Sequence, residues 1–383
     1  MNTLDFLKIH LDRLCESQSP EGSIKAGHNG PYHIKETPIR NSAHFLLFAS
    51  RFSEMFGSIK YEEAAHKAFN YLKSSKHFIE GRVYAQWEDY TIEDCTNGVI
   101  GSAWVIEALV EYYRVFGNEE AIVIARNIFK AHKFDSKSGL YFRQEIKNQR
   151  DRIDQTLNHQ IWFIAATLKL SSYCEEVRDE ALNHAQIFFD LVFKRAIQYN
   201  GTVFHHAILP QRDFRSKLGV IKRCIQIVRG LVSGDENASK LEIDKHIYLY
   251  WKSIGYHSFL LYGLAAIREH SSNGIIMPSS KIEAAVGYLN SNEFKDLISI
   301  EERYSLKYNP PAIERLYINE VFLKEINEQA VDDLSDYLSV YYDFESMTFR
   351  KDKVWDVATH NVRLYQLCLL DGSTLDKMKL NIG

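Results

Sequence analysis

The chain has 383 residues, with 46 Lys and Arg against 50 Asp and Glu, so its formal net charge is −4. This mildly acidic balance lacks the basic stripe that a nucleic-acid-binding surface requires, and we expect no nucleic-acid partner. Hydrophobic residues make up 45% of the chain, enough for a sizeable core. Aromatic residues make up 13%, and they either fill that core or line a pocket.

Targeting signals and metal-binding motifs are missing from the sequence. Residues 1–14 alternate charged and apolar groups at helical spacing, without the apolar core or cleavage site of a signal peptide. No apolar run reaches the roughly 18 residues of a membrane span. The five cysteines are scattered and form no CxxC pair, which predicts free thiols in a reducing compartment and no zinc site. We therefore expect a cytoplasmic protein with no membrane span, metal ion or other cofactor.

Two kinds of helix alternate along the chain. Apolar residues recur at spacings of three and four, which indicates helices. In chain order, amphipathic helices are predicted over 4–15, 61–75, 119–132, 176–195, 280–290 and 328–342. More uniformly apolar helices are predicted to begin near Asn41, Asn97, Gln155, Gly255, Pro311 and Thr359.

The apolar helices form a repeat. Their starts lie about 50 to 60 residues apart, except for one longer gap before Gly255. Six apolar helices inside six amphipathic helices make a closed all-α barrel, the (α/α)6 or six-hairpin toroid; an open solenoid of helix pairs is the alternative. We predict a single (α/α)6 domain over 1–383, because six pairs is the number that closes.

Short β-like segments precede several of the apolar helices. They cover 78–87, 134–142, 196–207 and 342–355, and the first three contain a turn glycine. We expect each to form a small β-hairpin in a loop on the rim of the barrel. The longest irregular region, 196–250, is predicted to be a flap or insertion, with an ordinary surface loop as the alternative.

The barrel brings the starts of the inner helices to one end, so polar and aromatic residues near those starts converge on one cavity. Carboxylates bind sugar hydroxyls and transfer protons, while aromatic rings stack on the apolar faces of sugars. This combination predicts a sugar site. The expected sugar-binding residues are His44, Trp87, Asp89, Asn158, His159, Tyr256, His257, Glu314, Trp355 and His360.

Two aspartates, Asp94 and Asp154, precede the second and third inner helices. Asp154 and Asn158 are four residues apart and share one helix face. Aspartate is also a favoured N-cap residue, so helix capping alone is the alternative for either. One side chain can both cap a helix and line a cavity.

The stretch around Asp154 resembles a known family. Ile153-Asp154, followed by Asn158, Ile161 and Ala165, is similar to the catalytic-aspartate helix of unsaturated glucuronyl hydrolases and their unsaturated rhamnogalacturonyl relatives. These are six-hairpin glycosidases, and similar proteins occur in gene clusters for surface polysaccharides or protein glycans. The resemblance implies that Asp154 protonates the double bond of an unsaturated sugar and then activates water.

Asp94 falls where that family has its second conserved aspartate. The resemblance implies that Asp94 binds sugar hydroxyls and tunes the pKa of Asp154. The chain departs from the family at this point. The family has a His-Asp pair followed closely by Gly, whereas this chain has Glu93-Asp94 with Gly98 later. The same substrate therefore does not follow.

The sequence favours a glycoside hydrolase acting on a uronic-acid-containing oligosaccharide or glycan. Two functions of other kinds remain open. One is a sugar epimerase using His257 and His360, since epimerases with this barrel use a histidine pair. The other is a non-catalytic glycan-binding or polysaccharide-assembly protein. Candidates to bind a uronate carboxylate are Arg40, Arg82, Arg152 and Lys252.

Overall fold

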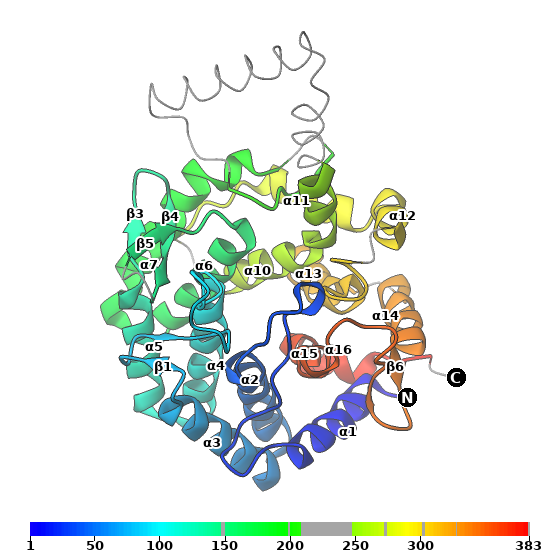
Figure 1. Cartoon of the computed structure of the whole chain (residues 1–383). Coiled ribbons are helices and arrows are strands. Elements are labelled where there is room, and N and C mark those ends of the chain that lie inside the picture. The colour runs from blue at the N-terminus through cyan, green and yellow to red at the C-terminus, as the bar shows by residue number, and fades with distance from the viewer. Residues whose placement is uncertain are drawn as a thin grey trace.

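The computed structural model describes residues 1–146, 150–197, 200–207, 247–271, 274–300, 303–326 and 328–381. Within these residues, an inner ring of helices is surrounded by an outer one (Figure 1). The inner helices are α2 (Ile39–Phe56), α4 (Ile100–Phe116), α6 (Leu157–Ser171), α10 (His257–His270), α13 (Pro311–Leu323) and α15 (Val357–Arg363), which continues as the 3-10 helix η3 (Leu364–Leu369).

The outer helices are α1 (Thr3–Glu16), α3 (Ile59–Ser74), α5 (Glu119–Ala131), α7 (Glu175–Leu191), α11 (Ser279–Leu289) and α14 (Glu328–Tyr341). Each inner helix packs against the next, in the order α2, α4, α6, α10, α13 and η3, and both α15 and η3 return to α2. The ring is therefore closed, which confirms the predicted (α/α)6 barrel over the open solenoid. Short helices that the sequence did not predict are η1 (Gly30–Tyr32), α12 (Asn292–Ile300) and α16 (Gly372–Lys377). The helix predicted over 176–195 is divided into α7 and the 3-10 helix η2 (Phe193–Arg195).

Burial explains why the two helix types differ in composition. Every residue of α2 from Ile39 to Ser50 is buried, because neighbouring inner helices and the outer layer cover all its sides. The outer helix α3 instead buries one stripe at spacings of three and four, made of Tyr61, Ala64, Ala65, Ala68, Phe69 and Leu72. None of the described helices combines the length and apolar character that crossing a membrane requires.

Three of the four expected rim hairpins are antiparallel strand pairs: β1 (Phe78–Ile79) with β2 (Val83–Tyr84), β3 (Phe134–Asp135) with β4 (Leu140–Glu145), and β6 (Tyr342–Asp343) with β7 (Thr348–Phe349). The described residues of the segment 196–207 form no strand pair but two isolated bridges, Ile197 with Val203 and His206 with Thr156. An unpredicted strand, β5 (Arg150–Ile153), pairs with β4 and leads directly into Asp154. Of the flap or insertion expected over 196–250, residues 208–246 lie outside the described residues.

One outer helix offers a test of local stability. The side chain of Asn118 caps α5 by accepting a hydrogen bond from the Glu120 N–H at 3.1 Å. We expect Asn118→Ala to lower the free energy of unfolding by about 1 kcal/mol, because one N–H loses its partner. Ser58 at the start of α3 makes no such bond, so Ser58→Ala is the matched control. Urea unfolding of both variants checks the difference, and equal losses would contradict the assigned cap.

Candidate functional site

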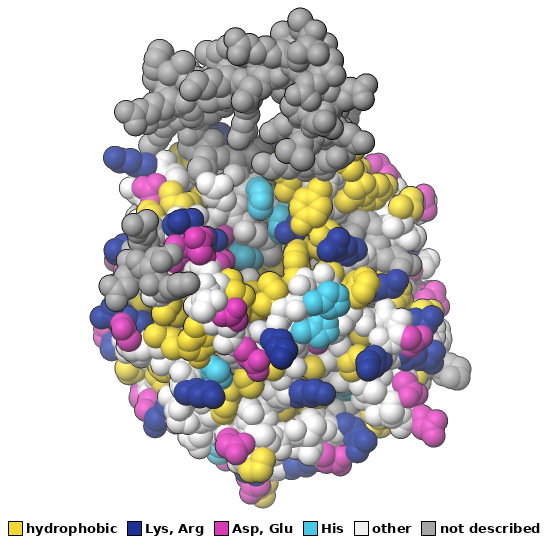
Figure 2. All heavy atoms as spheres, viewed as in Figure 1, with side chains coloured by type: hydrophobic (Ala, Val, Ile, Leu, Met, Phe, Trp, Pro, Cys, Tyr) yellow, Lys and Arg dark blue, Asp and Glu magenta, His cyan; other side chains and the backbone are white. Residues whose placement is uncertain are grey.

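A cavity of about 270 Å³ lies at the end of the barrel where the inner helices begin. Histidine and hydrophobic side chains gather around the hollow on this face (Figure 2). Its wall combines aromatic, acidic and basic groups. The lining residues are Asn29, Tyr32, Ile34, Arg40, Trp87, Ile92, Asp94, Asn97, Ile100, Trp104, Thr156, Asn158, His159, His205, Lys252, Tyr256, Phe259, Tyr308 and Asn309.

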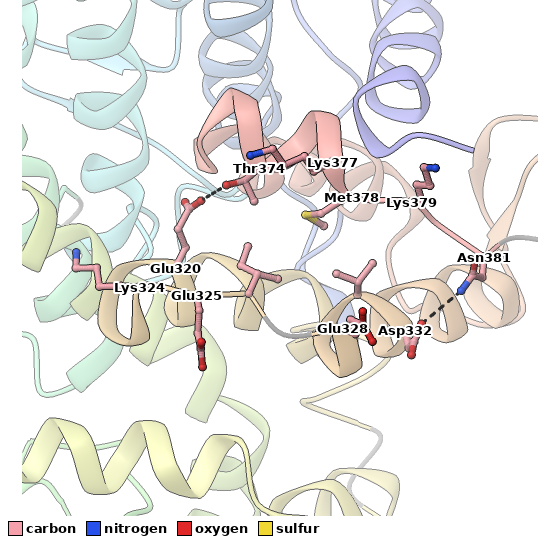
Figure 3. Close-up of a pocket in the computed structure, with 12 residues that line it drawn as sticks. Glu320, Lys324, Glu325, Glu328, Asp332, Thr374, Lys377, Met378, Lys379 and Asn381 are labelled. Carbon is pink, nitrogen blue, oxygen red and sulfur yellow. Dashed lines mark hydrogen bonds between the residues drawn. The ribbon is translucent and has the colours of Figure 1, made fainter.

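A larger groove of about 710 Å³ lies near the opposite end of α13, between that helix, α14 and α16 (Figure 3). Two of its carboxylates accept hydrogen bonds from neighbouring side chains. Glu320 accepts a hydrogen bond from Thr374 at 2.8 Å, and Asp332 accepts one from Asn381 at 3.4 Å. No aromatic ring is among the described residues that line it. The cavity at the helix starts is therefore the better candidate for the predicted sugar site.

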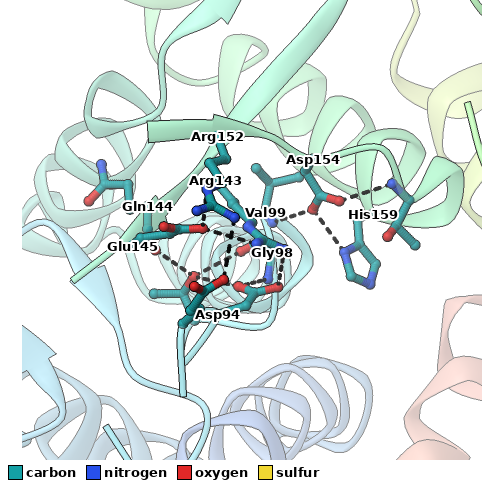
Figure 4. Close-up of polar contacts among 12 residues, drawn as sticks. Asp94, Gly98, Val99, Arg143, Gln144, Glu145, Arg152, Asp154 and His159 are labelled. Carbon is teal, nitrogen blue, oxygen red and sulfur yellow. Dashed lines mark hydrogen bonds and ion pairs between the residues drawn. The ribbon is translucent and has the colours of Figure 1, made fainter. Parts of the chain in front are cut away.

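Asp94 lies in the loop that precedes α4 and reaches the cavity wall. Its Oδ1 accepts a hydrogen bond from the Gly98 N–H at 2.7 Å, and its Oδ2 lies 3.3 Å from Nη1 of Arg143 (Figure 4). The loop turns sharply here, because Asn97 and Gly98 both have positive φ, 56° and 58°. This turn presents the backbone N–H groups at the start of α4 to acidic side chains.

Asp154 lies behind that turn and is buried, with 3% of its surface exposed. Its Oδ2 accepts a hydrogen bond from the Val99 N–H at 3.0 Å, and its Oδ1 accepts one from the Thr156 N–H at 3.0 Å. The same Oδ2 lies 2.9 Å from Nδ1 of His159. Two carboxylates therefore bind the consecutive N–H groups of Gly98 and Val99 (Figure 4).

The two carboxyl groups differ in acidity. Burial and the charge of Asp154 raise the pKa of Asp94, although the Gly98 N–H and Arg143 oppose the shift. Burial also opposes ionisation of Asp154, but His159 and the two backbone N–H donors together hold the pKa of Asp154 below its usual value. Asp94 therefore keeps its proton to higher pH than Asp154 does.

His159 connects Asp154 to the cavity. Its ring lines the cavity wall, and its Nδ1 faces the Asp154 carboxylate. A carboxylate acceptor fixes the proton on Nδ1 and leaves the lone pair on Nε2. The structure therefore brings together a protonatable carboxyl group and a carboxylate-oriented imidazole at one wall.

Aromatic rings and Arg40 form another part of the wall. Trp87 donates a hydrogen bond from its indole N–H to the Asp94 carbonyl at 2.7 Å, so its ring is fixed. The guanidinium of Arg40 lies 4.4 Å from the centre of the Trp104 ring. Arg40 also pairs with Glu36 at 2.9 Å, with both side chains buried. Its charge is therefore already balanced within the protein.

Lys252 has a different environment. Its Nζ lies 5.3 to 5.9 Å from the centres of four tyrosine rings. Within the part of the chain that the structure describes, no carboxylate forms an ion pair with it. Burial and the positive charge of Arg303 lower the pKa of Lys252 to about 8. Among the cavity-lining cations, Lys252 is thus the better placed to bind an anion.

The other two arginines considered for a uronate carboxylate do not line the cavity. Arg152 lies 3.3 Å from Glu93 and 3.2 Å from Glu145. Arg82 is exposed in the turn between β1 and β2.

Two further predicted residues lie below the cavity. His44 is buried, with its ring centre 4.5 Å from Tyr365 and 5.5 Å from Trp104. Glu314 is fully buried, pairs with Arg363 and accepts a hydrogen bond from Ser258 at 2.5 Å. Burial raises the pKa of Glu314 to about 7. Neither side chain reaches the cavity wall.

The histidines of the epimerase hypothesis lie outside the cavity lining. His257 contacts the Ala285 carbonyl at 3.0 Å and the Val203 N–H at 3.3 Å. His360 contacts the Asp356 carbonyl at 3.0 Å. Burial lowers the pKa of both rings, to about 4 for His257 and about 3 for His360. No described group of three His, Cys, Asp or Glu side chains is arranged to hold a metal ion.

Of the remaining predicted residues, Trp87, Asn158, His159 and Tyr256 line the cavity. Asp89 does not; it accepts a hydrogen bond from the Thr91 N–H at 2.8 Å in an exposed loop. Trp355 borders a neighbouring groove rather than the cavity itself.

Sequence reasoning missed several lining residues because they lie before or between the periodic helices. Asn29 and Tyr32 belong to the loop before α2, and Tyr308 donates a hydrogen bond to Asn29 at 2.7 Å. Positive φ at Asn29, Gly30 and His33 shapes that loop. The signal that could have found them is the Gly- and Asn-rich run 27–33, which marks a structured turn beside an inner helix.

The closed ring of helices, with a cavity where the inner helices begin, is the six-hairpin (α/α)6 fold. No known protein-family profile matches the chain. Archaeal glycosylation protein Q of Haloferax volcanii is 28% identical over 375 residues, covering 96% of this chain and 97% of that protein.

Two solved structures share the fold over nearly the whole chain. Cellobiose 2-epimerase from Spirochaeta thermophila superposes with a TM-score of 0.58 at 13% identity, covering 94% of this chain and 92% of the other. An unsaturated glucuronyl hydrolase specific for heparin superposes with a TM-score of 0.54 at 9% identity, covering 96% and 95%. This chain therefore has the six-hairpin fold of carbohydrate-active proteins, including the hydrolase family that its sequence resembles.

Proposed function

We propose that this protein is a glycoside hydrolase for a uronic-acid-containing oligosaccharide, with Asp94 as general acid and His159 as general base. The observation that carries the proposal is the shared turn at the start of α4. There Asp94 binds the Gly98 N–H, and Asp154, the partner of His159, binds the Val99 N–H. A proton donor, Asp94, and a proton acceptor, His159, thus lie in the wall of one cavity.

In this mechanism Asp94 protonates the leaving oxygen of a glycosidic bond or, in an unsaturated sugar, the ring double bond. Its raised pKa supports the donor role. Nε2 of His159 accepts a proton from water, which attacks the activated sugar carbon. Asp154 remains ionised, orients the imidazole and stabilises the imidazolium that forms. Relative to the family resemblance, the two aspartates exchange roles, because backbone donors and His159 stabilise the charged form of Asp154.

A uronate carboxylate would meet Lys252 on the tyrosine-lined side of the cavity. We expect binding of D-glucuronate to weaken as the pH rises through about 8, because Lys252 loses its proton there while the sugar carboxylate stays charged. Lys252→Met should weaken binding and remove this pH dependence. Calorimetric titrations between pH 6 and 9 check both effects (the pH limits bracket a lysine pKa of about 8); an unchanged pH profile in the variant would remove Lys252 from the site.

The function is tested on a panel of oligosaccharides with saturated and unsaturated uronic acid ends. Hydrolysis releases a new reducing end from either kind of substrate and removes the ultraviolet absorbance of an unsaturated ring. We expect one of these signals with the native protein, and the same signal at least about a hundredfold more slowly with Asp94→Asn. Absence of any product change across the panel would count decisively against hydrolysis.

Epimerisation is the second candidate, and one observation favours it. Two histidines, His159 and His205, line the same cavity, and a pair of imidazoles can remove and return a proton at a sugar carbon. The barrel match to cellobiose 2-epimerase also supports it. Solvent deuterium entering a sugar without bond cleavage distinguishes this reaction. Sugar binding without either signal would indicate the third alternative, a glycan-binding or assembly protein.

A further inference from the structure

A second groove, of about 860 Å³, opens beside the cavity and is lined by Tyr and Trp rings, two of which are exposed. Trp355 is 38% exposed and Tyr248 is 44% exposed. Exposed apolar side chains that gather in one groove are typical of a ligand-binding site, whereas single exposed side chains are not. The groove is lined mainly by Tyr248, Trp251, Tyr304, Trp355, Arg303 and Lys307.

The groove and the cavity share a wall of tyrosines. The Tyr304 ring centre lies 6.0 Å from that of Tyr32 and 5.9 Å from that of Tyr256, both of which line the cavity. On the groove side, Tyr304 donates a hydrogen bond to the Tyr248 hydroxyl at 3.2 Å. Lys252 lies between the two spaces, 5.9 Å from both of these rings. The cavity and the groove are therefore neighbours, separated by one layer of aromatic rings.

The groove is positively charged where the described residues line it. Arg303 and Lys307 contribute cations, and the described lining contains no Asp or Glu. Each cation lies against a ring: the Arg303 guanidinium is 5.2 Å from the Tyr304 centre, and the Lys307 Nζ is 5.9 Å from the Trp355 centre. Contacts of this kind fix a charge beside an aromatic surface. That arrangement suits a sugar ring that carries a carboxylate.

We propose that this groove binds a second, acidic sugar unit of the substrate, adjacent to the unit in the cavity. Trp355 stacks on the ring of that unit and Arg303 pairs with its carboxylate. The inference rests on the proposed function for the identity of the ligand as a glycan, and it specifies an acidic oligosaccharide of at least two units. A neutral glycan would leave the cations of this lining without an anionic partner.

Binding measurements test this separately from catalysis. The protein carries Asp94→Asn so that no ligand is consumed, and the probes are D-glucuronate and its oligomers of two to four units. Neutral oligomers of glucose with the same lengths are the reference. We expect the second acidic unit to improve the dissociation constant at least about tenfold at low salt, and the improvement to shrink as salt rises.

Substitutions test whether the groove residues provide the affinity gained from the second acidic unit. Arg303→Ala and Trp355→Ala should each remove most of the improvement given by the second unit. Both should leave glucuronate binding unchanged at about pH 6, where Lys252 is protonated with or without the charge of Arg303. Arg303→Lys should restore part of it, and Arg82→Ala, at the exposed turn between β1 and β2, should have no effect. Three results would each overturn the proposal. Neutral oligomers could improve the dissociation constant as much as acidic ones, both alanine variants could keep the improvement, or no acidic probe could bind. If Asp94→Asn lost turnover but the second acidic unit did not improve the dissociation constant, the groove proposal would fail and the proposed hydrolase function would stand.

Discussion

Asp94→Asn should lower kcat about 10²- to 10⁴-fold, because it removes the proton donor while keeping the shape of the loop. The amide oxygen of asparagine can still accept the hydrogen bond that Oδ1 of Asp94 receives from the Gly98 N–H at 2.7 Å. The start of α4 should therefore keep its structure. We expect the melting temperature to change little and sugar binding to persist, so that the loss appears in kcat rather than KM.

Asp89→Asn is the matched control for this result. Asp89 lies five residues earlier in the same loop region and accepts a hydrogen bond from the Thr91 N–H at 2.8 Å, away from the cavity lining. The same chemical change there should leave kcat unchanged. Steady-state rates of both variants on a substrate identified from the panel provide the comparison. If Asp94→Asn retained native activity, Asp94 could not be the general acid.

The pH dependence gives a second check on the same group. Burial and the charge of Asp154 raise the pKa of Asp94 above that of an exposed aspartate. The active, protonated form of Asp94 is therefore retained to higher pH, and activity should fall as the pH rises through its pKa. In Asp94→Asn, the residual activity should lose this alkaline limb.

The fold was largely predictable because helical spacing and burial are properties of the sequence. The run from Ile39 to Ser50 is apolar or small at nearly every position, and it forms an inner helix buried on all sides. The stripe in α3 marks an outer helix just as clearly. Ring closure between α15 and α2 followed from counting six pairs. The β5 strand was missed because Arg150–Ile153 is charged and has no strand pattern.

The site was predictable only as a region. Cavity-lining residues such as Trp87, Asn158 and His159 were found because they lie at or just before the starts of inner helices. His257 and His360 have similar positions, yet their rings turn into the packed layer between helices, where backbone groups bind them. A sequence gives the position of a residue along a helix but not which side chain the neighbouring helix covers.

The link between Asp154 and His159 was also beyond sequence reasoning. Five residues separate them, and Asn158 is the better match to one helical turn. The contact forms because Asp154 precedes α6 in extended chain and its carboxylate is held by N–H groups of Val99 and Thr156. The Val99 donor comes from another hairpin. Only the assembled barrel brings that turn to the carboxylate.

Gly98→Ala should damage both stability and activity, because this glycine is required by its conformation and by its neighbours. Its φ is +58°, in the left-handed region, where a side chain costs about 1 kcal/mol. An added Cβ would also lie 2.0 Å from Oδ2 of Asp154 and 2.4 Å from Nδ1 of His159. Relief of that overlap must move the carboxylate or the imidazole. We therefore expect at least a tenfold loss of kcat.

Gly117→Ala separates the two causes. Gly117 follows α4 with a φ of +67°, and an added Cβ there meets nothing within 4 Å. This control should lose about 1 kcal/mol of unfolding free energy from backbone strain alone and keep its full kcat. Gly98→Ala should lose more on both measurements, since it adds a steric conflict at the Asp154–His159 contact. If the two variants had the same free energy of unfolding and the same kcat, the Asp154–His159 contact would not be needed for catalysis. His159 would then lose its proposed role as the general base.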